Sequence, residues 1–277
     1  MDLWDGLAGV VLLGLFAASL GFGAFARRRL PAQHRTTETA ETLQLVMSLL
    51  ITFAALVLGL LTTSVKSIYD TDEHDRVTYA AELTQLDRCL RNYGPEAAPV
   101  RDLLRTYTAT VIVSTWPDEP RPGGVATLDP AAMPQTGAVP ALAGIMNDIG
   151  LGLHRLAPSD ALGKAIAADC FDAYKDVLKG RLAVIGDVYS SMSTPFFCAV
   201  VAWLAVVFAG LGFRAPLNPA IVAMVGLAMV SVTSALVITY DMNSPYEGPL
   251  RIPSRPMRAA LEEMGDGPVP MGVPTRP

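Results

Sequence analysis

The sequence predicts an all-α membrane protein, with four transmembrane helices and a helical bundle inserted between spans two and three. Four segments of at least 20 residues contain no Asp, Glu, Lys or Arg, and each is long enough to cross about 30 Å of hydrocarbon as a helix. The chain is 51% hydrophobic and 17% charged, below the roughly 25% charged residues of soluble domains. Between the second and third uncharged segments, apolar residues recur at helical spacing.

The first span is expected at residues 7–26 and the second at residues 43–65. A cleaved signal peptide would begin with basic residues, whereas this chain begins with Asp2 and Asp5 and carries Arg27, Arg28 and Arg29 after the apolar run. This order favours a retained first helix.

The loop between these spans, "RRRLPAQHRTTETAE", is rich in arginine and is expected to be cytoplasmic. Lys66, Lys179 and Arg181 flank the spans on the other side, but the dense arginine cluster outweighs them. We therefore expect a multi-pass protein of the cell (inner) membrane, with the N-terminus, the large loop and the C-terminus on the extracytoplasmic side.

Residues 66–187 form the predicted extramembrane helical domain. A first seam is followed by a stripe from Val100 to Val111 that stops at Trp116, and a third helix is expected at residues 139–156. The first seam consists of Tyr79, Leu83, Leu86, Leu90 and Tyr93. The fourth stripe consists of Leu162, Ile166, Cys170, Tyr174, Leu178, Leu182, Ile185, Tyr189 and Met192. These stripes are expected to bury against one another in a bundle. No Gly or Pro lies between Val65 and Leu90, and the fourth stripe leads directly into the third span, so spans two and three are expected to continue out of the bilayer as long helices of this bundle.

Spans three and four are expected at residues 192–213 and 217–239, followed by a C-terminal turn and short helix at 240–264 and a disordered tail at 265–277. Small residues four apart, such as Ser19 with Gly23 and Ala205 with Ala209, permit close helix packing in lipid. Hydroxyl residues in spans two and four either bond to their own helix or line a polar path.

Two polar groups invite a chemical interpretation. "YDTDEHD" at residues 69–75 offers carboxylates and a histidine, but it lacks the glycine and distant glutamate of a calcium loop, so a solvated turn is the better account. Cys89 and Cys170 lie on or beside the packing stripes. They are either buried thiols or, in an oxidising compartment, a disulfide, because spacing alone does not show proximity.

Catalytic signatures are missing from the sequence. It contains no GxSxG, HExxH, phosphate loop, GxGxxG or cysteine/histidine zinc spacing. We expect no enzyme activity, no cofactor and no bound metal. The net charge of −5 and the lack of basic patches interleaved with aromatic residues also argue against nucleic-acid binding.

The segment "YDMNSPYEGPLRIPSRPMRAAL" resembles the end of a bacterial membrane family known as the bestrophin-like domain. That family has a Leu-Asp-x-Pro-Phe-x-Gly motif, which Asp241, Pro245, Tyr246 and Gly248 resemble. The chain departs from it in having Tyr240 before the aspartate, two additional residues before the proline, and Ile-Pro in place of Ile/Val-Ser.

Two further segments resemble the same family. The first loop is similar to its basic-Pro-His-Arg loop through Arg35, with Glu38 or Glu41 near a family Asn-Glu. "LLRTYTATVIVSTWP" is similar to its Tyr…Trp-Pro segment through Tyr107 and Trp116. The resemblance implies kinship with anion channels.

Two functions follow as expectations: an oligomeric ion channel, or a non-conducting membrane scaffold or sensor whose helical domain binds a partner or small ligand. The expected partners are the lipid bilayer, further copies of this chain and an ion or small ligand. Asp241, at the end of span four, is either a helix cap or an organising residue that binds one of the arginines Arg251, Arg255 and Arg258.

Overall fold

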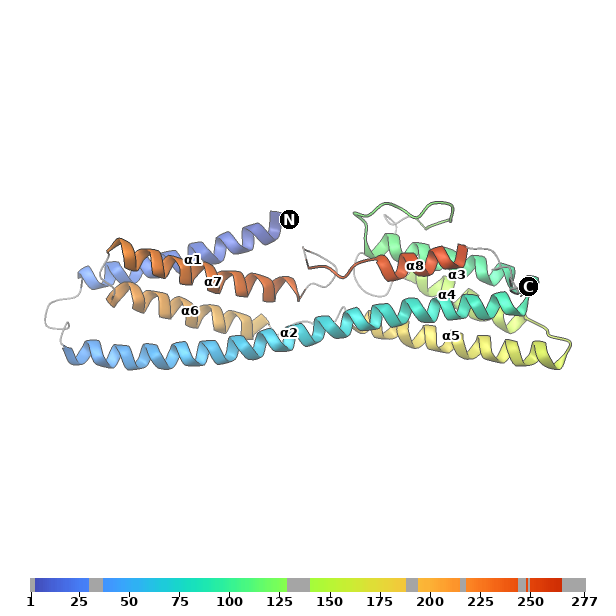
Figure 1. The fold of residues 1–277 in the computed structure, drawn as a ribbon, viewed down its shortest axis with the longest axis horizontal. Coiled ribbons are helices and arrows are strands. Elements are labelled where there is room, and N and C mark those ends of the chain that lie inside the picture. The colour runs from blue at the N-terminus through green and yellow to red at the C-terminus, as the bar shows by residue number, and fades with distance from the viewer. Residues whose placement is uncertain are drawn as a thin grey trace, which may run out of the picture. The chain divides into compact units, whose positions relative to one another are not determined.

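A computed structural model describes residues 3–29, 37–128, 140–187, 194–214, 218–243, 248 and 250–265. Over these ranges the chain forms helices and no strand, which confirms the predicted all-α class (Figure 1). The elements are α1 (Leu3–Arg29), α2 (Thr37–Tyr93), η2 (Pro95–Ala97), α3 (Ala98–Thr115), α4 (Pro140–Arg155), α5 (Ala161–Asp187), α6 (Thr194–Arg214), α7 (Pro219–Asp241) and α8 (Arg255–Gly265).

The chain divides into two compact units. The span unit comprises Met1–Asp70 and Ser191–Arg251, and the bundle unit comprises Thr71–Ser190 and Ile252–Pro277. α2 is one continuous helix of 57 residues that contributes to both units. The sequence predicted this continuation because no glycine or proline lies between Val65 and Leu90. The predicted continuation of α5 into α6 falls on residues outside the described ranges.

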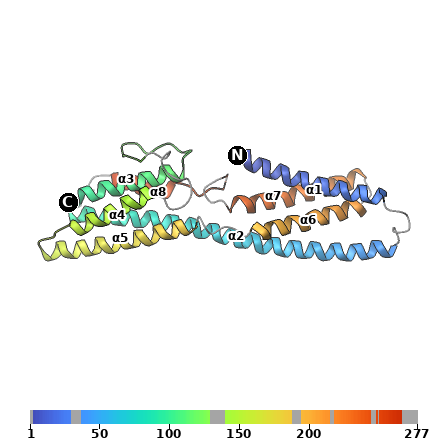
Figure 2. The same ribbon diagram turned by 180° about the vertical axis from the view of Figure 1, so that it is seen from behind.

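In the span unit, α1, α6, α7 and the first part of α2 lie side by side (Figures 1 and 2). The four candidate membrane spans are Leu7–Arg29, a segment within Glu41–Tyr93, Pro195–Arg214 and Pro219–Asp241. Large apolar side chains cover their outward faces, among them Val10, Phe22, Leu45, Leu60, Met224 and Leu227. Water would be an unfavourable solvent for so much apolar surface, whereas lipid is a favourable one. The protein therefore crosses the membrane with four helices.

Two glycines allow α1 and α6 to approach each other closely. A methyl group added to Gly23 would overlap the carbonyl oxygen of Ala209, and one added to Gly212 would overlap the carbonyl oxygen of Leu20. Only glycine fits at such backbone contacts between helices in lipid. Next to this contact, the buried rings of Phe16 and Phe208 pack with centroids 5.0 Å apart.

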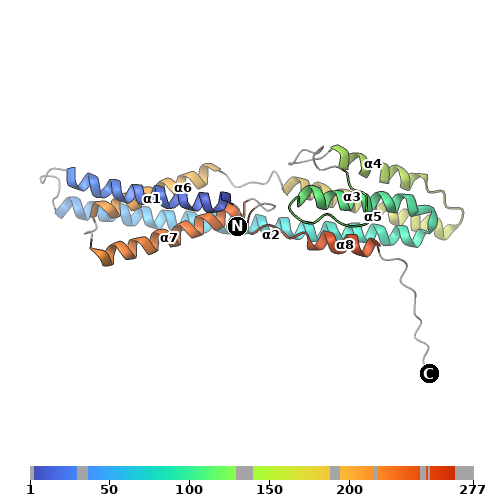
Figure 3. The ribbon, with the colours of Figure 1, turned by 90° about the horizontal axis from the view of Figure 1, so that it is seen from above.

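The bundle unit packs α3, α4, α5, α8 and the later part of α2 around one apolar core (Figure 3). Of the first predicted seam, Tyr79, Leu83, Leu86 and Leu90 are buried, and Tyr93 packs against the core.

The fourth predicted stripe is partly wrong, because Leu162 and Leu182 are 68% and 66% exposed. Cys170 and Tyr174 of this stripe are buried, and Ile166 and Leu178 pack against the core. A fourfold spacing drifts around a helix of 3.6 residues per turn, so the buried face of α5 continues from Cys170 through Val177 and Val184, which the stripe did not include.

Candidate functional site

The C-terminal segment folds back on the end of α7. Asp241, the last residue of α7, is only 5% exposed, and its Oδ2 accepts a hydrogen bond from the backbone N–H of Leu250 at 3.1 Å. Gly248 has a φ of 78°, a left-handed conformation that favours glycine at this turn. Pro245 and Tyr246 of the same motif lie outside the described residues, as does Arg35 of the first loop.

The next residues of the segment bind the end of α3. Trp116, at the C-terminal cap of α3, is buried, and its indole Nε1–H donates to the buried carbonyl oxygen of Ile252 at 2.9 Å. The guanidinium of Arg76 lies 5.2 Å from the centroid of the indole ring, within the range of a cation–π interaction. The tryptophan and the C-terminal segment, which sequence analysis singled out separately, therefore meet in one buried contact.

Glu119, in the loop after Trp116, holds the start of α8. Its Oε2 accepts hydrogen bonds from the Ser254 hydroxyl and from Nε of Arg258, the latter at 3.0 Å. Arg258 also donates through Nη2 to the carbonyl oxygen of Pro120 at 2.8 Å. Arg258 was one of three arginines considered as partners for Asp241, and in the structure it binds Glu119 instead.

A buried ionic cluster holds the other end of α8. Asp87 accepts from Nη2 of Arg91 at 2.9 Å and from Nε of Arg101 at 2.9 Å, and its side chain is 2% exposed. The same two arginines donate to backbone carbonyls at the end of α8, Arg91 to Glu263 at 2.9 Å and Arg101 to Met264 at 3.3 Å. These carbonyls have no partner within their own helix, and cations are favourable at a helix C-terminus. Of this cluster, only the spacing of four residues between Asp87 and Arg91 is visible in the sequence.

We call residues 241–265 the C-terminal strap. One side of its helical part is apolar, and the residues that it buries in the bundle core are Met257, Ala260, Leu261 and Met264. Its two ends are held by different polar contacts, with Glu119 and Trp116 at the beginning of α8 and with Arg91 and Arg101 at its end. Within the strap, Asp241 accepts the hydrogen bond from Leu250, and α8 buries its apolar side in the core of the bundle unit.

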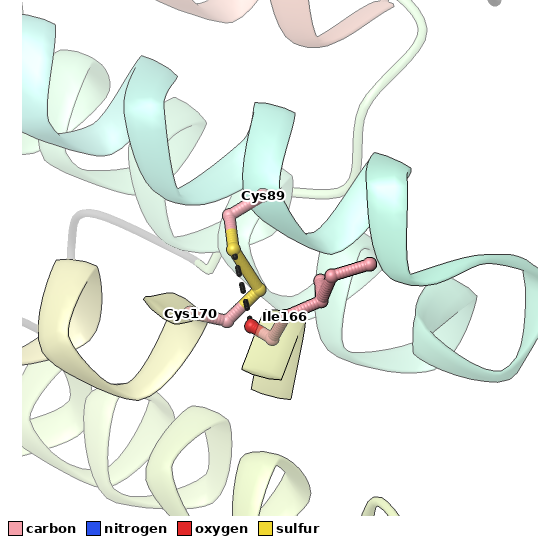
Figure 4. Close-up of a disulfide and its surroundings, with 3 residues drawn as sticks. All are labelled: Cys89, Ile166 and Cys170. Atoms are coloured by element: carbon pink, nitrogen blue, oxygen red, sulfur yellow. Dashed lines mark hydrogen bonds between the residues drawn. A yellow bond between two sulfur atoms is a disulfide. The ribbon is translucent and has the colours of Figure 1, made fainter. Parts of the chain in front are cut away.

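The two cysteines considered from the sequence are brought together in the bundle unit. Cys89 of α2 and Cys170 of α5 are joined by a disulfide, with Cα atoms 5.4 Å apart (Figure 4). Cys170 is fully buried, and the Ile166 carbonyl oxygen lies 3.6 Å from the Cys89 sulfur. A sulfur in a disulfide carries no proton, so this last contact is a hydrogen bond only when the pair is reduced. The third cysteine, Cys198, is free and exposed.

The polar sequence at residues 69–75 was expected to be a solvated turn. The turn is wrong because the segment is helical, whereas Asp70, Thr71, Glu73 and His74 are exposed as expected. These residues lie within the continuous helix α2, and Asp72 is 2% exposed. Nothing in the sequence interrupts the helix here, and its backbone hydrogen bonds continue through the polar residues. Among the described residues, no group of three or more His, Cys, Asp or Glu side chains is placed to hold a metal ion.

Five hydroxyl groups of the spans form two kinds of hydrogen bond. Ser19, Thr52 and Thr63 donate to the carbonyl four residues earlier in their own helices, each at 2.9 Å. Thr62 of α2 and Thr239 of α7 instead form a hydrogen bond between helices, with hydroxyl oxygens 3.2 Å apart. Packing and backbone bonding therefore account for these five hydroxyl groups, while the outward position of Thr52 and Thr63 bears on function below.

The fold defines a class: a four-span helical membrane protein whose bundle unit is inserted after the second span and strapped to the C-terminus. The bestrophin-like domain matches residues 13–257, so the chain belongs to the bestrophin-like family. A comparison with the curated proteins found no relative.

Solved structures share this fold. Two mutant forms of a bacterial bestrophin homologue from Klebsiella pneumoniae are each similar with a TM-score of 0.63. At 14% and 15% identity, they cover 91% and 93% of this chain and 97% and 99% of their own. A further structure, described as a membrane protein, has a TM-score of 0.58 at 13% identity and covers 96% of this chain and 100% of its own. At identities this low, the structural similarity establishes a shared fold and no more.

Proposed function

We propose that the chain is one subunit of an oligomeric ion channel, and that α2 lines the conduit. The observation that carries this proposal is an exposed stripe on α2, formed by Glu41, Ser48, Thr52, Gly59 and Thr63. Their spacings of seven, four, seven and four residues follow an 11-residue repeat, which keeps one face of a nearly straight helix. The exposed Leu45 lies beside this stripe, but the five residues of the stripe are polar or small, and such residues on a membrane span are suited to water and ions.

The opposite face of α2 packs inside its own subunit. Met47, Ala54 and Val65 are buried and follow the same repeat. The interior of the span unit is occupied by side chains such as Phe16 and Leu236, both fully buried. A conduit along the exposed stripe therefore requires further copies of the chain, each contributing its α2.

Cysteine substitution tests whether this stripe faces a conduit. Thr52→Cys is introduced with Cys198→Ser, leaving the disulfide pair intact, and ion flux is measured in liposomes before and after a charged thiol reagent. We expect the reagent to inhibit flux. Phe53→Cys is the matched control, because Phe53 is exposed on another face of α2, and its flux should be unchanged.

Two results would contradict this proposal. If the reagent inhibits the Thr52→Cys and Phe53→Cys proteins equally, the stripe on α2 does not line the conduit. Monomeric wild-type protein without flux of any ion would favour the scaffold or sensor function, in which the bundle unit binds a partner.

We further propose that Asp241 organises the strap rather than only ending α7. Its carboxylate accepts from the Leu250 N–H, and the strap then continues directly to the Ile252 carbonyl bound by Trp116. Loss of this bond would loosen the turn that follows α7. Asp241→Asn should reduce oligomer formation or ion flux, with Glu247→Gln as control carboxylate. If the Asp241→Asn protein matches wild type in expression, oligomer size and flux, Asp241 serves only as a helix cap.

For the orientation, we propose that the arginine-rich loop is cytoplasmic and the bundle unit extracytoplasmic. Two independent observations support it: the charge of the first loop, and the disulfide, which persists in oxidising compartments. Single cysteines at Gln33 and Gly123, in a background without native cysteines, should label oppositely with an impermeant reagent. Labelling of Gln33 from outside the cell would reverse the assignment.

A further inference from the structure

A basic surface lies where α1 and α6 end and α2 begins. α1 and α6 run in the same direction (Figures 1 and 2), and Gly23 near the end of α1 lies against Ala209 and Phe213 near the end of α6. The last residue of α6, Arg214, donates to Gln44 early in α2 at 3.0 Å. The C-terminal ends of both spans therefore bring their basic residues to the same end of the span unit.

Three arginines follow one another at the end of α1, and they have different surroundings. Arg27 is one turn beyond Gly23 and so lies on the face of α1 that packs on α6. Arg28 and Arg29 are exposed, and neither forms an ion pair with any described residue. Two guanidinium groups at the end of a membrane span thus remain available to an external anion.

Arg29 lies on the lipid-facing side of α1. Phe22 and Phe25 are 69% and 54% exposed, and Arg29 follows them at helical spacing on the same face. The guanidinium of Arg29 lies 5.0 Å from the centroid of the Phe25 ring. A phenyl ring in contact with acyl chains would therefore hold this guanidinium at the depth of the headgroups.

We infer that Arg28 and Arg29 bind the phosphate of an anionic phospholipid headgroup. Guanidinium groups form paired, charge-assisted hydrogen bonds with phosphate oxygens, and basic residues next to a span attract anionic lipid. Glu41, whose side chain is exposed, is the first acidic residue after these arginines whose side chain the structure describes. Arg27, Arg28, Arg29 and Arg214 together exceed its charge, so the described residues at this end of the span unit carry a net positive charge. This inference does not depend on ion conduction.

Lipid binding is measured on the full chain in detergent, by native mass spectrometry with added phosphatidylglycerol or phosphatidylcholine. We expect phosphatidylglycerol to bind in preference to zwitterionic phosphatidylcholine. Arg28→Gln with Arg29→Gln should weaken phosphatidylglycerol binding about 30-fold at low salt. Arg121→Gln with Arg155→Gln is the matched control, because it removes the same charge from exposed positions of the bundle unit, and it should bind as wild type does.

A second variant separates loss of charge from loss of structure. Arg28→Lys with Arg29→Lys keeps both charges and should retain the preference for phosphatidylglycerol. Equal binding of the two lipids by wild type, or unchanged binding by the double glutamine variant, would overturn the inference. Competition by inorganic phosphate as effective as that by phosphatidylglycerol would also overturn it, because the site would then be one for a free anion.

Discussion

Asp87→Asn is the substitution that tests most directly what holds the C-terminal helix. The wild-type carboxylate accepts hydrogen bonds from Arg91 and Arg101, and both arginines in turn donate to the last carbonyls of α8. Asparagine has nearly the same volume but no charge, and its amide can present N–H groups to the guanidiniums. We expect both arginines to lose their position, so that the end of α8 detaches from the bundle.

The magnitude follows from the burial of the three side chains. Removing one member of a buried ion pair costs about 3–5 kcal/mol, because the remaining charge is left without a partner. Asp87 is 2% exposed, but the side chains of Arg91 and Arg101 keep 20% and 24% of their surface exposed, so water offsets part of the loss. We therefore expect the free energy of opening α8 to fall by about 2–3 kcal/mol, which corresponds to about 30- to 160-fold.

Hydrogen exchange of the α8 amides measures this opening directly. Exchange in the Asp87→Asn protein should accelerate by the stated factor in α8, with little change in α4. Glu263→Gln is the control, because the Arg88–Glu263 pair is exposed on both sides, and an exposed pair contributes about 0–1 kcal/mol. If α8 of Asp87→Asn exchanges at the wild-type rate, the ionic cluster does not hold the helix.

Three further predictions concern other contacts. Gly23→Leu should prevent α1 from packing on α6 and abolish a monodisperse peak in size-exclusion chromatography, whereas Gly14→Leu, with nothing within 4 Å, should not. Cys89 and Cys170 should resist alkylation in unreduced protein, as measured by mass spectrometry, and alkylation of both would refute the disulfide. Their bond should stabilise the bundle by about 4 kcal/mol. Trp116→Phe should lower the free energy of unfolding by about 1–3 kcal/mol, because the buried carbonyl of Ile252 loses its hydrogen-bond donor. An unchanged denaturant midpoint would indicate that water replaces the indole as the donor.

Several features could be predicted from the sequence because they depend on neighbouring residues. An uncharged run of 20 residues is long enough to span a bilayer whatever its partners, and the seam through Leu83, Leu86 and Leu90 follows from helical spacing alone. The continuity of α2 follows from the absence of any helix-breaking residue after Val65. Asp241 and Trp116 were singled out by resemblance, without any indication of what they touch.

Tertiary structure decided the rest, because it joins residues that local spacing does not relate. Asp87 and Arg91 lie one helical turn apart, and their spacing could have indicated a pair, but nothing indicated Arg101 or the end of α8. Arg258 binds Glu119 across 139 residues of sequence, although Asp241 is much nearer along the chain. The sequence by itself thus determined four spans and a set of amphipathic helices, since hydrophobicity and backbone bonding act locally. Only packing decided which face of α5 is buried, that the two cysteines meet and that α8 is buried in the bundle core, since these depend on which surfaces exclude water together.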